Sequence, residues 1–64
     1  MEAGDIVVIC APTSPNDGKR ARVIDVANGY DAMHDAFDKD FMTLEMLDTG
    51  LVGAIHRRFV SEVQ

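Results

Sequence analysis

The chain has 64 residues, of which 6 are basic and 11 acidic, so its net charge is −5, and 47% of its residues are hydrophobic. This length suffices for one small domain, residues 1–64, and the hydrophobic fraction is that of a globular rather than a disordered protein. No apolar run approaches the roughly 20 residues of a membrane-spanning helix. The lone Cys10 cannot form an intramolecular disulfide, and the acidic first residues do not resemble a signal peptide, so we expect a cytoplasmic protein.

Short apolar runs separated by turn residues predict an all-β domain. The first strand is expected within residues 5–11, where β-branched residues are dense, and Pro12 ends it. A loop of turn-forming residues follows over residues 13–18. The second strand is expected within residues 19–27 and ends at the turn signal Asn28-Gly29.

The most regular pattern lies in the second half of the chain. Residues 41–47 alternate between apolar and polar, and Asp48-Thr49-Gly50 links them to a second apolar run at residues 51–55. A three-residue link that ends in glycine predicts a β-hairpin with a type I turn and a left-handed glycine. One tight turn is expected at residues 56–58, and a last strand at residues 59–63. The residues predicted to form the core are Met42, Leu44, Met46, Ile24, Val26, Val8 and Ile55.

The segment between the second and third strands has a different pattern. Tyr30, Met33, Phe37 and Phe41 follow one another at helical spacing, with aspartates on the opposite side. This spacing predicts either a two-turn helix or a loop that carries one helical turn, because a helix so short is marginal in water unless it packs on something.

Five strands with these connections resemble an SH3-like barrel. Within residues 4–26, the sequence Gly4-Asp5-Ile6-Val7-Val8-Ile9, a loop, and then residues 17–26 with their basic start resemble the KOW motif of ribosomal and transcription-elongation proteins. Ala21 departs from that motif, which usually has a second glycine here. The chain is also similar to small SH3-like accessory subunits of photosynthetic electron-transfer complexes. Both resemblances imply a five-stranded barrel with a short helical or loop insertion between strands two and three.

Two surfaces are candidates for binding. The insertion carries Tyr30, Met33, Phe37 and Phe41, and aromatic and methionine side chains bordered by charge are favoured at protein contacts. The second candidate is a basic patch made of Lys19, Arg20, Arg22, Arg57 and Arg58, which in KOW proteins would face RNA or a protein partner. The acidic total and the absence of tryptophan make nucleic acid the less favoured ligand.

Other chemistries lack the residues they need. Asp31, His34, Asp35 and Asp38 would share one face of a helix, but a solvated helix face explains such a pattern better than a metal site. Cys10 lies in the most apolar run and is expected to be a small buried side chain. No nucleophile stands near a base, and no glycine-rich phosphate loop exists, so we expect no enzyme, no cofactor and no metal. A groove for proline-rich peptides would need more aromatic residues than this chain has.

The sequence therefore predicts a non-catalytic protein-interaction or accessory module with a protein partner and no membrane contact. A KOW-type module associated with RNA and an accessory subunit of an electron-transfer complex remain as alternatives. Whether the chain forms homo-oligomers is left open.

Overall fold

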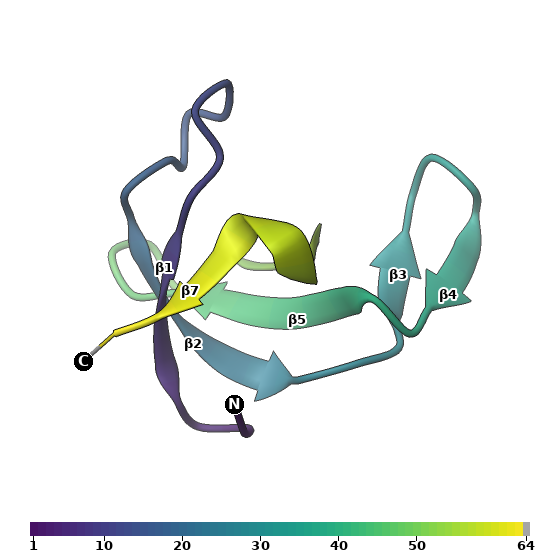
Figure 1. Cartoon of the computed structure of the whole chain (residues 1–64), viewed down its shortest axis with the longest axis horizontal. Coiled ribbons are helices and arrows are strands. Elements are labelled where there is room, and N and C mark those ends of the chain that lie inside the picture. The colour runs from purple at the N-terminus through teal and green to yellow at the C-terminus, as the bar shows by residue number, and fades with distance from the viewer. Residues whose placement is uncertain (64) are drawn as a thin grey trace.

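The computed structural model describes residues 1–63 and confirms an all-β protein. Its strands and single 3₁₀ turn are β1 (Ile6–Ile9), β2 (Arg20–Asp25), β3 (Gly29–Asp31), β4 (Ala36–Asp38), β5 (Phe41–Met46), β6 (Val52–His56), η1 (Arg57–Phe59) and β7 (Val60–Glu62). Five of these strands form one antiparallel sheet in the order β6-β5-β2-β1-β7, and β3 and β4 form a separate two-stranded hairpin. Figure 1 shows this hairpin standing apart from the sheet at one end of the molecule.

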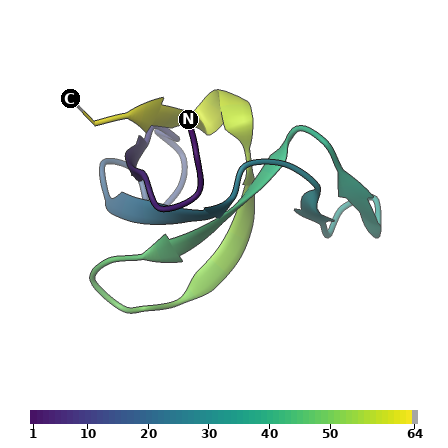
Figure 2. The same ribbon diagram turned by 90° about the horizontal axis from the view of Figure 1, so that it is seen from below.

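The five-stranded sheet is strongly curved. Strands β6 and β7 lie at its opposite edges, yet only the three residues of η1 join them. In a flat sheet these edges would be roughly 19 Å apart, at about 4.8 Å per strand spacing. A 3₁₀ turn rises only about 2 Å per residue, so three residues cannot bridge that distance. The sheet must therefore curl until its two edges approach each other at η1, as Figure 2 shows.

The core lies on the inner face of this curved sheet. Its buried residues are Val7, Ile9, Ala11, Ala21, Val23, Met42 and Leu44, and the half-buried Met46, Ile55, Phe59 and Val60 pack against them. The predictions for Met42 and Leu44 are confirmed, and Met46 and Ile55 lie at the margin of the core.

The predictions for Val8, Ile24 and Val26 are wrong, because they assumed the opposite alternation in the first two strands. Val7 pairs with Ala21 on the inner face, whereas Val8 pairs with Arg20. Arg20 and Arg22 face water, so Ala21 and Val23 between them face the core. The register then shifts between Val23 and Asp25, which places Asp25 opposite Thr43 and leaves Ile24 outside the regular alternation. Ile24 is 44% exposed and Val26 is 39% exposed.

The hairpin predicted around Asp48-Thr49-Gly50 is confirmed as β5 and β6. Gly50 has φ of 75°, the left-handed conformation that glycine adopts without strain, and its N–H donates to the Met46 carbonyl at 2.8 Å. The tight turn after β6 is confirmed as η1. The Nδ1 atom of His56 accepts the Arg58 N–H at 3.1 Å and caps this turn.

An insertion does lie between β2 and β5, but its predicted helical or loop conformation is wrong, because residues 29–38 form the β3–β4 hairpin. Tyr30 lies directly opposite Phe37, so a spacing of seven residues joins two strands across a turn rather than two turns of a helix. The left-handed backbone of Asp35, with φ of 50°, is incompatible with a continuous helix. Gly29 starts the hairpin, and a Cβ atom there would lie 3.0 Å from the Phe41 backbone. This close approach anchors the hairpin to the start of β5.

Candidate functional site

A hollow of about 660 Å³ lies between the β3–β4 hairpin and the outer face of β5 and β6; we call it the hairpin pocket. All four residues predicted as a partner-binding surface line it: Tyr30, Met33, Phe37 and Phe41. The remaining wall comes from outer-face residues of β5 and β6, including Thr43 and Ala54. The structure therefore brings the four predicted residues together, although in a hairpin rather than on a helix.

The aromatic and thioether groups of this pocket are open to solvent. Met33 is 91% exposed and Phe37 is 76% exposed, although both are large apolar side chains. The Tyr30 and Phe37 rings pack edge to face, with centroids 5.6 Å apart. Exposed aromatic and methionine side chains gathered at one place are typical of protein-binding surfaces.

Hydrogen bonds within the β3–β4 turn order its backbone and the Tyr30 hydroxyl. The carboxylate of Asp31, which is only 6% exposed, accepts the Met33 N–H at 3.0 Å and lies 2.6 Å from Nδ1 of His34. The bond to His34 is the main reason why the pKa of Asp31 is lowered, and the Met33 N–H adds to it. The Tyr30 hydroxyl donates to the Asp35 carboxylate, which raises the pKa of Tyr30.

The border of the hairpin pocket is acidic. Residues 25–40 include five aspartates and one lysine, and Asp25 and Asp31 are among the residues that line the pocket. Asp38 accepts the Asp40 N–H at 2.8 Å, and Asp40 lies 3.9 Å from Arg57. Asp31, Asp35 and Asp38 thus each accept a hydrogen bond within the hairpin or directly after it. Residues 1–63 contain no group of three histidine, cysteine, aspartate or glutamate side chains placed to hold a metal ion.

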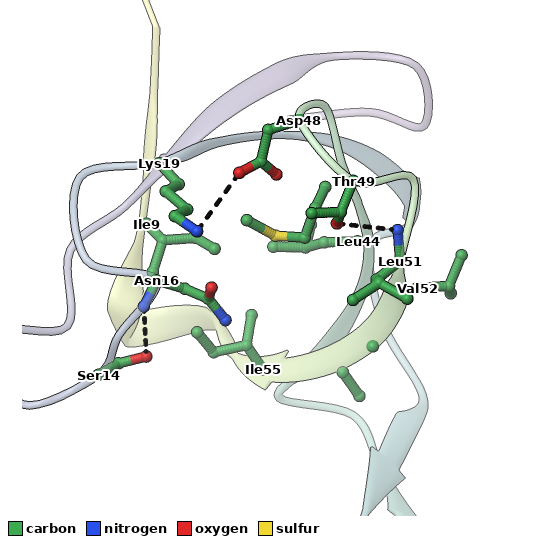
Figure 3. Close-up of a pocket in the computed structure, with 13 residues that line it drawn as sticks. Ile9, Ser14, Asn16, Lys19, Leu44, Asp48, Thr49, Leu51, Val52 and Ile55 are labelled. Carbon is green, nitrogen blue, oxygen red and sulfur yellow. Dashed lines mark hydrogen bonds and ion pairs between the residues drawn. The ribbon is translucent and has the colours of Figure 1, made fainter.

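A second hollow, of about 460 Å³, lies on the inner face of the sheet; we call it the loop pocket (Figure 3). Its floor is apolar, with Ile9, Leu44 and Ile55 at its base. Lys19 and Asp48 point toward each other at its mouth, with Nζ 3.3 Å from the carboxylate. This ion pair is half exposed and contributes about 0–1 kcal/mol to stability.

Strand β6 separates the two pockets. Val52, Gly53 and Ala54 line both of them, and β6 is an edge strand of the sheet. The sequence pattern did not mark these residues as part of a site. An apolar run without charge in a strand was the available signal, but only the sheet order shows that this strand lies at an edge.

The five basic residues lie in two segments of the chain, at the start of β2 and in η1. Arg20 and Arg22 belong to β2, where Arg22 lies opposite Glu45, and their side chains form an ion pair at 3.5 Å. Arg57 comes directly after His56, the last residue of β6. The level of Arg22 and Glu45 corresponds on β6 to Val52, which is four residues before His56. At about 3.3 Å per residue, roughly 13 Å of strand separates the two levels. Lys19, Arg22 and Arg57 are each paired with a carboxylate, and Arg58 lies over the Phe59 ring at 4.9 Å.

Cys10 is exposed, so the expectation that it is buried is wrong. It follows Ile9, whose side chain faces the core, and the alternation of β1 therefore turns Cys10 outward. Its Sγ atom lies 3.5 Å from the Ser61 hydroxyl.

Among residues 1–63 no helix is long and apolar enough to cross a membrane. Comparisons of the chain with protein-family models, with curated proteins and with solved structures gave no match.

Proposed function

We propose that this chain is a non-catalytic protein-interaction module and that the hairpin pocket is its partner-binding surface. The observation that carries the proposal is the convergence of Tyr30, Met33, Phe37 and Phe41 on one pocket, with Met33 and Phe37 largely exposed to solvent. A chain this small has little apolar surface to spare from its core. Two large apolar side chains left in solvent on a hydrogen-bonded hairpin are therefore better explained by binding than by stability.

We further propose that the curved sheet is a barrel of the SH3-like type. The strand order β6-β5-β2-β1-β7, together with the 3₁₀ turn η1 that joins β6 to β7 in the chain, supports this assignment. The β3–β4 hairpin is then an insertion between the second and third barrel strands. Fold analogy implies no ligand by itself, so the class of partner follows from the chemistry of the pocket.

The pocket favours a protein rather than a nucleic acid. Its aspartates would repel phosphate groups, and three of the five basic residues proposed for a nucleic-acid patch are already paired with carboxylates. Methionine adapts to differently shaped apolar partners, and exposed aromatic rings provide a large contact area.

Selection of short random peptides displayed on phage against the immobilised protein tests the proposal. Enriched peptides should bind Phe37→Ala more weakly by about 2 kcal/mol, or roughly thirtyfold in Kd, if Phe37 is a hot spot. Leu47→Ala is the matched control, because Leu47 is 45% exposed but lines neither pocket. Peptides that bind both variants equally well, or a selection that enriches none, would contradict the proposal.

A further inference from the structure

The free edge of β6 is the feature that extends the proposed function. Arg57 N–H donates to the Asp40 carbonyl at 2.8 Å, and Met46 N–H donates to the Leu51 carbonyl at 2.8 Å. In an antiparallel pair, residues alternate between facing the neighbouring strand and facing away from it. Leu51, Gly53, Ile55 and Arg57 therefore direct their backbone groups toward β5. Val52 and Ala54 direct theirs away from the sheet.

These outward backbone groups have no partner within the described part of the chain. Among residues 1–63, β5 is the only strand that pairs with β6, and no backbone hydrogen bond beyond that pairing involves Val52 or Ala54. In Figure 2, β6 runs along the margin of the curved sheet. Proteins usually protect such an edge with charge, proline or a bulge, but residues 51–55 contain neither charge nor proline.

Each face of this edge has a pocket. Ala54 lies opposite Thr43 on the outer face, beside the hairpin pocket, and Gly53 lies opposite Leu44 on the inner face, beside the loop pocket. A Cβ atom added at Gly53 would meet no atom within 4 Å, so the space next to Leu44 is open. A strand added to β6 would send alternate side chains into the two pockets.

We propose that β6 binds an extended segment of a protein partner as an additional strand, in which apolar residues alternate with lysine or arginine. The proposal rests on the proposed function, because it uses the hairpin pocket for one set of partner side chains. Backbone hydrogen bonds to Val52 and Ala54 supply affinity, and the two pockets select the side chains.

The chemistry of the two pockets sets the alternation. The loop pocket has an apolar floor of Ile9, Leu44 and Ile55 and accepts aliphatic side chains. The hairpin pocket combines aromatic rings with Asp25 and Asp31. A lysine or arginine fits there, with its aliphatic stem along Phe37 and its charge near the exposed carboxylate of Asp25.

A second copy of this chain is the less favoured occupant. Each copy has a net charge of −5, and an antiparallel β6–β6 pair would place both acidic hairpins on the same face of the joined sheet. Like charges brought together in this way oppose association. A basic segment is instead attracted to the same surface.

The test uses end-capped peptides of alternating valine and lysine, with Kd measured by fluorescence anisotropy. In one peptide the backbone amides of the lysine residues are N-methylated. In the matched control peptide the backbone amides of the valine residues are N-methylated instead. In antiparallel addition, the lysine residues lie opposite Val52 and Ala54 and make the backbone bonds, so methylation of the lysine amides should weaken binding about tenfold or more. If only methylation of the valine amides weakens binding, the peptide adds as a parallel strand, which also supports the proposal. Equal effects of both sets would overturn strand addition, while the Phe37→Ala result still decides the proposed function.

Protein variants provide a second readout. Gly53→Val adds a side chain whose Cβ atom meets open space beside the loop pocket, and it should weaken the peptide about tenfold while the Tm stays unchanged or rises. Hydrogen exchange at the Val52 and Ala54 amides should slow when the peptide binds. No binding of the valine–lysine peptide, or equal binding of a valine–glutamate peptide, would overturn the proposal. The proposal would also be overturned if the protein without peptide sedimented as a dimer and Ala54→Pro abolished that dimer.

Discussion

Tyr30 and Phe37 face each other across the β3–β4 hairpin, and their rings meet edge to face with centroids 5.6 Å apart. Such a pair contributes about 0.5–1.5 kcal/mol beyond the area it buries. Here it shapes one wall of the hairpin pocket while Phe37 stays 76% exposed. The contact orders the hairpin without removing the aromatic surface from a partner's reach.

Phe37→Ala should therefore lower the free energy of unfolding by only about 1 kcal/mol, the value of the aromatic pair. Phe41→Ala is the contrasting variant, because Phe41 is half-buried, packs edge to face on His56 and lies against Gly29. It should cost about 2 kcal/mol, roughly half of the 3–5 kcal/mol of a fully buried phenylalanine. Urea denaturation measures both. Unfolding of the domain by Phe37→Ala would show that this ring is a structural part of the core.

Gly29→Ala should destabilise the protein, and Gly53→Ala should not. A Cβ atom at Gly29 would lie 3.0 Å from the carbonyl carbon and oxygen of Phe41, which are backbone atoms that cannot move freely. Overpacking of this kind costs about 1–3 kcal/mol. At Gly53 the new methyl group meets open space, and loss of glycine's freedom in the unfolded chain should stabilise by about 0.4–1 kcal/mol. Opposite shifts in Tm are expected, and equal shifts would contradict the close approach of β3 to β5.

His56→Ala should weaken the junction between β6 and β7. The variant removes the acceptor of the Arg58 N–H and the ring contacts with Phe41 and Phe59. Loss of a cap alone costs about 0.5–2 kcal/mol. His56→Asn keeps a side-chain acceptor and should recover part of that loss. Denaturant midpoints that are the same for both variants would show that the cap contributes nothing.

The lowered pKa of Asp31 predicts a loss of stability in acid. The ordinary pKa of this carboxyl is 3.8, and the folded state holds it lower. The folded state therefore favours the charged carboxylate. Its contribution is fully present above pH 3.8 and is lost as the pH falls below that value through the folded pKa. In Asp31→Asn the denaturant midpoint should depend less on pH in this range. An unchanged acid dependence would show that other carboxyl groups control it.

Nucleic-acid binding should be absent at physiological salt. If the basic residues did bind a single strand, the logarithm of the affinity would fall with that of salt at a slope near −0.7 per phosphate contact. Gel-shift assays with single-stranded RNA over a salt series test this, with the double variant Arg57→Glu and Arg58→Glu as comparison. Salt-sensitive binding that this variant abolishes would favour the KOW-type alternative over the protein-interaction module.

The sequence by itself determined the features that depend on neighbouring residues. The turn at Asp48-Thr49-Gly50 and the tight turn before β7 are local, because glycine backbone freedom and run length dictate them. It also identified Tyr30, Met33, Phe37 and Phe41 as a group, since their apolar character does not depend on the backbone that carries them.

Only the tertiary structure decided what depends on pairing between distant strands. Val8 is as hydrophobic as Val7, and its exclusion from the core follows from its position opposite Arg20. The seven-residue spacing from Tyr30 to Phe37 fits two turns of a helix, and it also fits two strands that face each other across a turn. Contacts of the hairpin with β5 favour the two strands. The exposed edge at Val52 and Ala54 exists because the strand order places β6 last, and strand order is a property of the whole sheet.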